Sequence, residues 1–511
     1  MVSKVYSLGL FGMEAFTVEV EADLSQGLPA FDIVGLPDAS VKESRDRVRA
    51  ALKNCGFSFP VSRITLNLAP ADVRKEGPIY DLPILVALLT ASGQLSGNLS
   101  RSAFAGELSL TGDVRPINGA LAMAIHAKQA GFERFFLPSV NAAEASAVDG
   151  IDILPVENID GLIRHLSGES PIKPALPGDY PFEEQEEYLD FSDVKGQHLA
   201  KKALEVAAAG GHNILLIGPP GSGKSMLAKR MPSILPEMTF DEQIETTKIH
   251  SIAGIMPPGV PLIKRRPFRA PHHTISPAGL SGGGSVPRPG EISLAHNGVL
   301  FLDELPEFSR RALEVLRQPL EDGTVNITRV AGSLSYHCSI MLIAAMNPCP
   351  CGYFGDPKHK CTCSPRMVSS YLNRVSGPML DRLDLHVEVP QVDFEAISST
   401  EKAESSAEIR RRVNAAREIQ RRRFEGTSVT CNARMTSAMI REHCRLTESA
   451  CAALKNAFER LNMSARAYDR VLKVARTIAD LAGSGNIDTA HIMQAVQLRS
   501  LDRKYWGNDS Q

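Results

Sequence analysis

One eight-residue segment in the middle of the chain constrains the fold more than any other feature. Residues 213–217, Asn-Ile-Leu-Leu-Ile, form a short apolar run of strand type, and a helix-like pattern begins at residue 226. Between them stands Gly-Pro-Pro-Gly-Ser-Gly-Lys-Ser, the G-x-x-x-x-G-K-S pattern of a phosphate-binding loop in its usual strand–loop–helix setting. Glycine backbones can close around phosphates at a helix N-terminus. The pattern therefore predicts an ATP site formed by Gly218, Pro219, Pro220, Gly221, Ser222, Gly223, Lys224 and Ser225.

Two further apolar strands end in polar side chains that suit the same site. Residues 298–302 lead into Asp303 and Glu304, and a third apolar run, residues 340–345, leads to Asn347. Asp303 and Ser225 suit a Mg²⁺ shell, and Glu304 suits polarisation of the attacking water. An Asp-Glu pair is more often a solvated strand end, but after a phosphate-binding loop it predicts the second half of an ATPase site.

Length and patterning divide the chain into several folding units. A chain of 511 residues is too long for one core. Residues 1–165 alternate short strands with helices, and residues 166–189 are rich in proline and glycine, as a linker is. A second α/β unit spans 190–392, and 393–511 is helical by pattern. In the first unit, Ser40 followed by Glu43 predicts a helix start.

Composition limits the classes of function. The net charge is −2, from 56 Lys+Arg and 58 Asp+Glu, which excludes a uniformly basic nucleic-acid coat but allows a locally basic pore. No apolar run reaches the roughly 18 residues of a membrane span, and the N-terminus lacks the apolar core of a signal peptide. We expect a cytoplasmic protein without a membrane partner.

Four of the nine cysteines crowd together shortly after Asn347, as Cys349, Cys351, Cys361 and Cys363. Four thiolates match tetrahedral Zn²⁺, and in a reducing compartment such a cluster favours metal over disulfides. The spacing departs from the commoner C-x-x-C, so reduced free thiols are the alternative, and His359 is a substitute ligand. A structural zinc here would brace the loop after Asn347.

Four segments resemble the magnesium-chelatase-like AAA+ family that includes YifB and the competence-associated helicase ComM. They are residues 269–273, 290–298, 347–352 and 376–384. The resemblance covers nearly the whole chain. It implies an α/β protein with a Lon-protease-like (ribosomal S5-type) N-terminal domain at 1–165, an AAA+ P-loop core with a parallel sheet, and a helical lid.

The resemblance also implies roles for individual polar residues. Asn347 matches sensor 1, near the γ-phosphate. Arg382, in the segment Ser-Gly-Pro-Met-Leu-Asp-Arg-Leu-Asp, matches an arginine finger that acts on a neighbour's ATP. Arg466 matches sensor 2, with Arg470 as the second choice; a surface salt bridge is the ordinary alternative for each arginine. A finger that acts on a neighbour requires a ring, usually a hexamer.

A Lon-type peptidase needs a serine activated by a lysine. Where that serine would follow Gly77-Pro78, the chain has Ile79 and Tyr80, and residues 119–123 contain no lysine. We therefore expect the fold without the peptidase. Basic residues of this domain are candidates for DNA contact, with a solvated helix face as the alternative for the first three: Arg45, Arg47, Arg49, Arg74 and Lys75.

Three further basic or alternating segments suggest DNA contacts. Residues 321–338 alternate polar and apolar side chains as a β-hairpin does, with Arg329 near the tip to contact phosphate. The basic, glycine-rich insertion 264–285, which includes Arg269, is a second candidate. Residues 410–423 carry seven arginines, which are either a solvated face or a DNA contact. Solvated loops are the alternative for the first two.

The sequence thus predicts an ATP-hydrolysing AAA+ ring that acts as a helicase or translocase on single-stranded or branched DNA. In ComM-like members the resemblance implies branch migration during recombination or natural transformation. Magnesium insertion is not carried over, because it needs porphyrin-binding partner subunits that nothing here resembles. The main alternative is a ring that remodels a protein client. A regulatory module that only binds ATP is disfavoured by Glu304 and Arg382.

Overall fold

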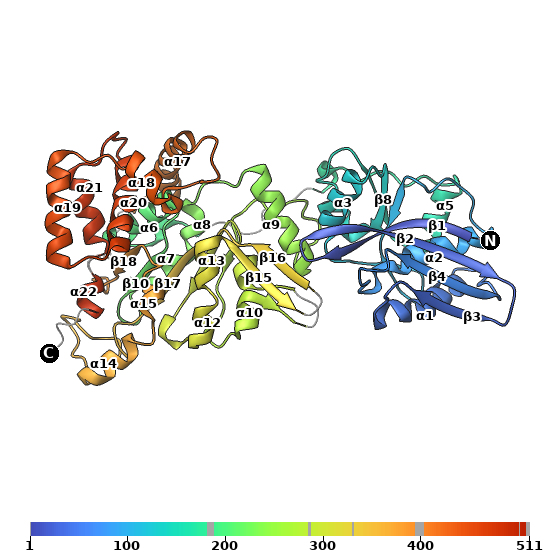
Figure 1. Cartoon of the computed structure of the whole chain (residues 1–511), viewed down its shortest axis with the longest axis horizontal. Coiled ribbons are helices and arrows are strands. Elements are labelled where there is room, and N and C mark those ends of the chain that lie inside the picture. The colour runs from blue at the N-terminus through green and yellow to red at the C-terminus, as the bar shows by residue number, and fades with distance from the viewer. Residues whose placement is uncertain are drawn as a thin grey trace.

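The chain is elongated, with three regions in a row. The computed structural model describes residues 2–180, 189–284, 288–329, 332–393, 403–499 and 501–506. Figure 1 shows an N-terminal region at one end, a core with the second sheet in the middle, and a helical region at the other end. No helix among the described residues has both the length and the apolarity to span a bilayer.

A mixed seven-stranded sheet organises the N-terminal region, in the order β3-β4-β2-β1-β5-β8-β9. Strands β1, β2 and β4 pair antiparallel, and the remaining neighbours pair parallel. Buried residues alternate along β2, so one face packs on helices. The strands are β1 (Val2–Phe11), β2 (Glu14–Ser25), β3 (Ala30–Val34), β4 (Arg63–Ala69), β5 (Ser102–Phe104), β8 (Arg134–Pro138) and β9 (Asp152–Val156), and a short ribbon joins β6 (Glu107–Leu108) to β7 (Val114–Arg115).

Helices cover this sheet. Helix α2 is apolar on every side and almost wholly buried, as a central helix must be. Helix α1 begins after Asp38, whose carboxylate accepts a hydrogen bond from the amide of Val41 at 2.7 Å. The predicted start at Ser40 is therefore wrong, because Asp38 already caps that end. The helices are α1 (Ala39–Asn54), α2 (Asp81–Ala91), α3 (Ala120–Gln129), α4 (Ala142–Ala145) and α5 (Ile159–Leu166).

The core contains five parallel strands in the order β11-β14-β17-β10-β18. Strands β10, β14 and β17 are buried along their whole length, as expected of a parallel sheet covered by helices on both faces. Because these strands are parallel neighbours, the segments that follow them meet at one edge. The strands are β10 (Ile214–Ile217), β11 (Phe268–Arg269), β14 (Val299–Leu302), β17 (Met341–Met346) and β18 (Leu385–Glu388).

The remaining core elements surround this sheet. A two-residue ribbon pairs β12 (Gly282–Gly283) with β13 (Arg288–Pro289). The helices are α6 (His198–Gly210), α7 (Lys224–Lys229), α8 (Met231–Ile234), α9 (Phe240–Ala253), α10 (Pro277–Ser281), α11 (Glu291–Leu294), α12 (Arg310–Glu314), α13 (Arg317–Asp322), α14 (Pro365–Leu372) and α15 (Gly377–Leu380).

The predicted hairpin is present. Strands β15 (Thr324–Arg329) and β16 (Gly332–His337) pair antiparallel from Thr324 opposite His337 to Arg329 opposite Gly332. Val325, Ile327, Leu334 and Tyr336 are buried, whereas Asn326, Ser335 and His337 are exposed, so the hairpin has one apolar and one polar face. The side chain of Arg329 lies outside the described residues.

The hairpin and helix α9 contact the N-terminal region, as Figure 1 shows. A Cβ atom on Gly12, in the turn between β1 and β2, would lie 2.8 Å from the Leu334 side chain of β16. Lys248 of α9 pairs with Glu14 at 3.0 Å, and the amide of Gly119 donates to the Ser251 carbonyl at 3.0 Å. The N-terminal region therefore rests directly on the hairpin that precedes β17.

The helical region consists of α17 (Ser406–Arg423), α18 (Ser437–His443), α19 (Glu448–Leu461), α20 (Ala465–Leu481), α21 (Thr489–Gln497) and α22 (Leu501–Trp506). Helices α17 and α20 share one apolar cluster with α6 of the core. Helix α22 instead packs into the core cluster beside the cysteine loop, where Tyr505 donates to Glu388 at 3.2 Å.

The arginines of α17 are mostly turned inward. Arg412 pairs with Glu205 and Glu404, Arg410 and Arg417 donate to core carbonyls, and Arg423 pairs with Asp480. The prediction of a wholly solvated or DNA-facing row is therefore wrong for these four, because α17 packs on α6 and α8. Arg411, Arg421 and Arg422 are exposed.

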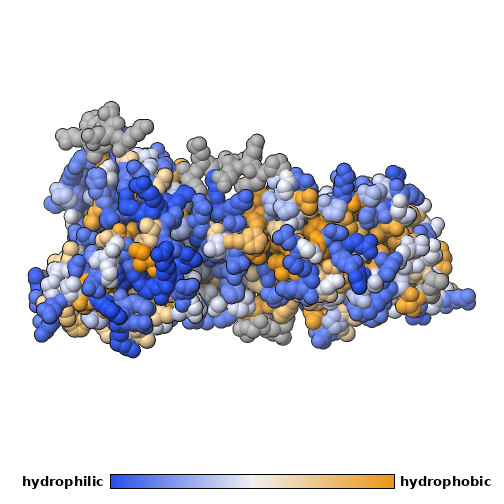
Figure 2. Space-filling view, turned by 90° about the horizontal axis from the view of Figure 1, so that it is seen from above, coloured by the Kyte–Doolittle hydropathy of each residue, from blue (hydrophilic) through white to orange (hydrophobic). Residues whose placement is uncertain are grey.

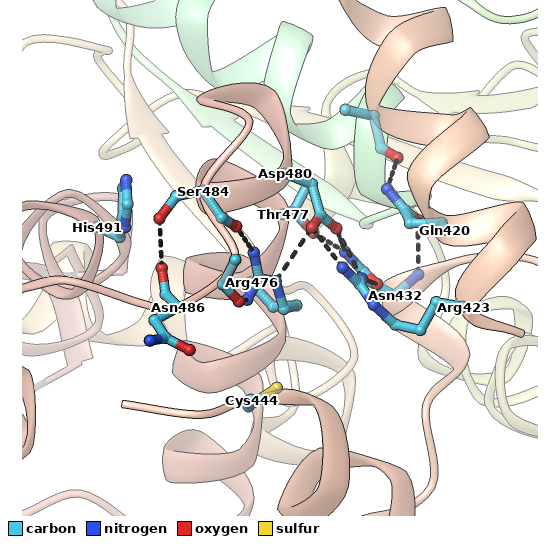
Figure 3. A network of polar contacts seen from close by, with 12 residues as sticks. Gln420, Arg423, Asn432, Cys444, Arg476, Thr477, Asp480, Ser484, Asn486 and His491 are labelled. Atoms are coloured by element: carbon cyan, nitrogen blue, oxygen red, sulfur yellow. Dashed lines mark hydrogen bonds and ion pairs between the residues drawn. The ribbon is translucent and has the colours of Figure 1, made fainter. Parts of the chain in front are cut away.

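A buried ionic network fixes the interior of the helical region (Figure 3). The carboxylate of Asp480 accepts from Arg423 at 2.5 and 2.7 Å, from Arg476 at 3.1 Å and from Asn432 at 2.8 Å. Asp480 and Arg476 are both almost fully buried. Two guanidinium groups thus share one carboxylate that water barely reaches.

We expect Asp480→Asn to destabilise the helical region strongly. Removal of the single carboxylate leaves two buried guanidinium groups without a counter-charge, which costs roughly 3 to 5 kcal/mol. Urea denaturation followed by circular dichroism measures this loss. Glu418→Gln is the control, because Glu418 pairs with Arg421 and Arg422 on the exposed face of α17 and should leave the midpoint unchanged. Equal midpoints for the two variants would contradict the network's role.

Candidate nucleotide-binding site

Three loops meet at the carboxyl edge of the core sheet. The glycine-rich segment follows β10, Asp303 and Glu304 follow β14, and Asn347 follows β17. In the sheet, β17 lies between β14 and β10, so Asn347 stands between the carboxylates and the phosphate loop. The structure therefore brings together the residues that the sequence assigned to ATP and Mg²⁺.

The backbone of the loop requires its glycines. Gly221 and Gly223 have φ angles of +74° and +90°, a region that favours glycine, and a Cβ atom on either would meet only open space. At Gly218, a Cβ atom would lie 2.1 Å from the carbonyl oxygen of Val389, after β18. Backbone conformation explains the two later glycines, and the close approach of a neighbouring segment explains the first.

The ammonium group of Lys224 lies inside the loop. It donates to the carbonyls of Gly218 and Pro219 at 2.8 and 2.9 Å, and lies 3.2 Å from Oδ1 of Asn347. Burial lowers the pKa of Lys224 to about 8, and the carboxylate of Asp303 opposes part of that shift. A buried cation within reach of a sheet-edge amide suits the β- and γ-phosphates of a nucleotide.

Ser225 and Asp303 are in direct contact. The serine hydroxyl donates to Oδ2 of Asp303 at 2.6 Å, while Oδ1 of Asp303 accepts from the amide of Glu304 at 2.9 Å. The pair offers only hard oxygen ligands, which fits Mg²⁺. Ser225 and Asp303 would hold the ion, and the ion would supply charge that neutralises the phosphates.

Glu304 is held by a histidine that sequence reasoning did not single out. Its backbone has φ +53°, its side chain is 57% exposed, and Oε2 lies 3.2 Å from Nδ1 of His273. The His273 ring also stacks obliquely on His272 and meets Phe308 edge-on. His273 belongs to a segment that carried the family resemblance, yet neither its spacing nor its type indicates contact with Glu304. It is placed to orient the carboxylate proposed to act on water.

A hollow of about 390 Å³ adjoins the phosphate loop. The Gln197 side chain donates to the carbonyls of Ser222 and Pro390 at 3.1 and 2.5 Å, which ties the hollow to the loop. Its position makes it the candidate pocket for the base of the nucleotide. Sequence reasoning missed it because its lining comes from two distant segments without a motif: Gly196, Gln197, His198, Glu388, Pro390 and Asp393.

Arg382 lies at the opposite end of the sheet. Asn213, just before β10, donates through Nδ2 to the carbonyl of Arg382 at 3.0 Å, whereas the phosphate loop follows the other end of β10. The guanidinium donates to the carbonyls of Pro378 and Arg317 and pairs with Glu321, and it is 11% exposed. Among the described contacts, none joins Arg382 to the phosphate loop of its own chain.

Arg466 and Arg470 lie near Arg382 and not near Lys224. Arg466, in the first turn of α20, is 73% exposed and lies 3.8 Å from Asp381. Arg470 is largely buried, between Asp381 at 3.5 Å and Asp384 at 3.4 Å. Of the two candidates for sensor 2, only Arg466 is free to reach outward, and it shares a surface with the segment of Arg382.

The four clustered cysteines converge. All four Sγ atoms lie within 4.8 Å of one another, and Cys349 approaches Cys351 and Cys361 at 3.3 and 3.7 Å. The thiols are free, and soft sulfur donors in this number fit Zn²⁺. His359 is not a member of the group; it stacks on Tyr353 and lies 3.6 Å from Asp356.

The cysteine loop packs on the phosphate loop. Gly352 has a φ angle of +87°, and a Cβ atom there would lie 2.4 Å from the ring of Pro220. The same loop begins at buried Cys349, two residues after Asn347. A change in the cysteine loop would therefore reach both the glycine-rich segment and Asn347.

Several basic residues predicted to contact DNA have partners within the chain. Arg269 forms a bidentate pair with Glu291, at 2.7 Å through both nitrogens, which raises the pKa of Arg269. Arg266 donates to carbonyls and to Glu242. Much of the basic insertion is thus internal structure, because Phe268–Arg269 forms edge strand β11 of the core sheet. The DNA contact predicted for Arg269 is not supported by this placement.

Among the basic residues of the N-terminal region, some are held inside the fold and others are exposed. Arg47 pairs with buried Asp81 at 2.6 Å, and Lys75 is fully buried and donates to the carbonyl of Val73 at 2.8 Å. Neither is on a DNA-accessible surface, so that prediction is wrong for both. Arg45, Arg49 and Arg74 have exposed or partly exposed side chains.

We expect nucleotide binding to take up a proton at alkaline pH. Burial lowers the pKa of Lys224 in the free protein to about 8, and bound phosphates favour the charged form, so binding raises that pKa. A non-hydrolysable ATP analogue should take up about half a proton per site at pH 8 and roughly a tenth at pH 7. Calorimetry in buffers of different ionisation enthalpy measures this. Lys224→Arg should show no uptake, because its guanidinium stays charged. Equal uptake in both proteins would exclude Lys224 as the source.

Comparison with known proteins agrees with this geometry. Residues 190–397 match the family described as magnesium chelatase, subunit ChlI; residues 20–141 match subunit ChlI of Mg-chelatase, and 403–499 its C-terminal family. The chain is 43% identical to the uncharacterized protein YifB of Escherichia coli K12 over 503 residues, which are 98% of this chain and 97% of YifB.

Two other relatives differ in how much of the chain they match. Competence protein ComM of Haemophilus influenzae is 43% identical over 506 residues, 98% of this chain and 97% of ComM. The magnesium-chelatase 67 kDa subunit of Chlorobaculum tepidum is 29% identical over only 166 residues, 31% of this chain and 23% of that subunit. Near-complete coverage with YifB and ComM, together with the three matched regions, shows that the chain belongs to the magnesium-chelatase-like AAA+ family of YifB and ComM.

Proposed function

We propose that this protein is an ATP-hydrolysing ring motor that moves on DNA. The observation that carries the proposal is the convergence of Lys224, Ser225, Asp303, Glu304 and Asn347 at one sheet edge. Lys224 and Asn347 bind the phosphates, and Ser225 and Asp303 hold Mg²⁺. Glu304, oriented by His273, polarises water for attack on the γ-phosphate.

The position of Arg382 supports an oligomer. The strand between Asn213 and Gly218 separates this arginine from the phosphate loop of its own chain, which favours a role at the site of a neighbour. Arg466 lies on the same side and joins it as sensor 2. A closed homo-oligomeric ring, as a hexamer, gives each site one such neighbour.

The hairpin β15–β16 supports DNA as the track. β16 continues after three residues into β17, whose end carries Asn347, so nucleotide state and hairpin position are linked through one buried strand. Its exposed face carries Asn326, Ser335 and His337, which can donate hydrogen bonds to phosphates of single-stranded or branched DNA. Arg329 is expected to add charge at the tip. The relative ComM is named a competence protein, which supports a role in natural transformation. In our proposal the motor would act there, or in recombination, by promoting branch migration.

A protein remodeller is the second candidate, and the hairpin argues against it. Rings that thread polypeptide grip it with exposed aromatic side chains, whereas Tyr336, the hairpin's aromatic residue, is fully buried.

In our proposal the motor works in the cytoplasm and comprises an inactive Lon-protease-like domain at 1–165, a linker at 166–189, an AAA+ core at 190–392 and a lid at 393–511.

We also propose that Cys349, Cys351, Cys361 and Cys363 bind one structural Zn²⁺. The mutual Sγ distances and the four-thiol donor set support this. Contact between Gly352 and Pro220 makes the ion a brace for the phosphate loop, and the ion takes no part in hydrolysis.

We expect Glu304→Gln to lower the ATPase rate by roughly 10²- to 10⁴-fold, because an amide cannot accept the proton of the attacking water. Steady-state phosphate release measures the rate, with and without forked or four-way DNA. Wild type should be stimulated by DNA and the variant should not. Glu133→Gln, at an exposed pair with Arg101 in the N-terminal region, is the matched control and should behave as wild type. A wild-type rate indifferent to every DNA would refute the DNA motor but leave the ATPase intact.

We expect one zinc ion per chain. The double variant Cys361→Ser/Cys363→Ser should bind no zinc. It should also bind a fluorescent ATP analogue more weakly, because the loop that supports Pro220 is no longer held by the ion. Metal analysis and fluorescence titration measure the two effects. Cys451→Ser, at an exposed thiol, should keep both zinc and affinity. Wild-type protein that lacks zinc while all four thiols react with a thiol reagent would refute the site.

A further inference from the structure

A fully buried histidine joins the helical region to the segment that carries Arg382. His212 lies between α6 and β10. Its Nε2 atom lies 2.8 Å from Oγ1 of Thr477 in α20, and its Nδ1 atom lies 3.4 Å from Oδ2 of Asp384. One imidazole therefore spans two elements that are far apart in sequence, and the ATP chemistry described above gives it no role.

The core side of this contact holds the Arg382 segment by its backbone. Asp384, two residues after Arg382, accepts from the amide of Asn213 at 3.2 Å. The Asn213 side chain donates to the carbonyl of Arg382 at 3.0 Å and accepts from the amide of Leu342, the second residue of β17, at 2.8 Å. His212 and Asn213 together therefore hold Arg382 and Asp384, the residues on either side of Leu383.

The helical side is anchored by the network in Figure 3. Thr477 donates to the carbonyl of Lys473 at 3.0 Å and accepts from Asn432 at 3.1 Å, and Asn432 also donates to Asp480. Thr477 is on the same helix as Arg470, which contacts Asp381 and Asp384 on either side of Arg382. Helix α20 thus contacts the segment directly through Arg466 and Arg470, and indirectly through the contact of Thr477 with His212.

The imidazole has no room to move. A Cβ atom on Gly210 would lie 2.2 Å from two ring atoms of His212 and 2.6 Å from Oγ1 of Thr477. The ring is enclosed by the end of α6 on one side and by α20 on the other. Because the ring is fully buried and contacts both Thr477 and Asp384, it is placed to couple the position of α20 to that of Asp384.

We propose that His212 is a positioning residue through which helix α20 sets the place of Arg382 in the neighbouring subunit's ATP site. This rests on the proposed function, in which Arg382 acts on a neighbour. A movement of α20 relative to the core would carry His212 through Thr477, and His212 would carry Asp384 and with it the segment of Arg382. In this way the position of the helical region in one subunit sets the rate of ATP hydrolysis in the next subunit.

The test uses mixed rings of two inactive chains. Lys224→Ala has no working phosphate loop but keeps Arg382, and Arg382→Ala has the reverse defect. An equimolar mixture should hydrolyse ATP, because the first chain lends its arginine to the second. His212→Phe, a planar ring of somewhat larger volume that can make neither polar contact, is then placed in one chain or the other.

In the Lys224→Ala chain, His212→Phe should lower the rate of the mixture on the order of tenfold to a hundredfold, as misplacement of a reacting group does. In the Arg382→Ala chain it should leave the rate and the affinity for a fluorescent ATP analogue unchanged. Equal losses in both chains would overturn the inference and make His212 a packing residue. A parent mixture without activity, beside active wild type, would instead refute the action of Arg382 on a neighbour.

Variants of Thr477 give a second measure. Thr477→Val in the Lys224→Ala chain removes the hydroxyl and should lower the rate of the mixture, whereas Thr477→Ser keeps the hydroxyl and should restore it. Equal losses for Val and Ser would show that the hydrogen bond to His212 is not the cause and would overturn the inference.

Discussion

Strand β10 is hydrogen-bonded on both sides, and its two ends carry the two halves of the ATPase chemistry. β17 and β18 pair with the same four residues, Ile214–Ile217, so the strand cannot shift without breaking both ladders. At its carboxyl end begins the loop that surrounds Lys224. At its amino end, Asn213 holds the backbone of Arg382. A short, doubly paired strand thus fixes the separation between the phosphate loop and Arg382, the arginine that we propose acts on a neighbouring subunit.

The sequence predicted those parts of the site that follow a buried strand within a few residues. Lys224, Asp303 and Asn347 each come after an apolar run, and parallel strands bring such ends together without further information. His273 and His212 could not be found in this way. His212 meets Thr477 across 265 positions, and His273, which precedes α10, meets Glu304, which follows β14, so no local pattern records either pairing.

Charge was the least predictable feature, for a related reason. Arg47, Arg269 and Arg412 look like surface cations in the sequence, yet each has a carboxylate partner that a different segment supplies. A run of arginines shows where cations are, but not whether the fold brings acids to meet them. Ser40 is the local version of the same problem, because Asp38, two residues earlier, already caps α1. Predictions from apolar residues agreed better with the structure, because the burial of one face of a helix or strand produces a regular spacing of apolar residues in the sequence.

The buried ion pairs bear on the positioning role that we propose for the helical region. Ionic contacts such as those of Asp480 add little net stability, since desolvation offsets most of the attraction, but only one geometry satisfies all the partners. Arg423, Arg476 and Asn432 meet one carboxylate from different directions, which fixes α17 and α20 relative to each other. Thr477 and Arg470 lie on the same helix, so a movement of α20 would carry both: Arg470 contacts the segment of Arg382 directly, and Thr477 contacts it through His212. The polar interior therefore fixes α20 in one arrangement relative to α17, as the proposed positioning of Arg382 by α20 requires.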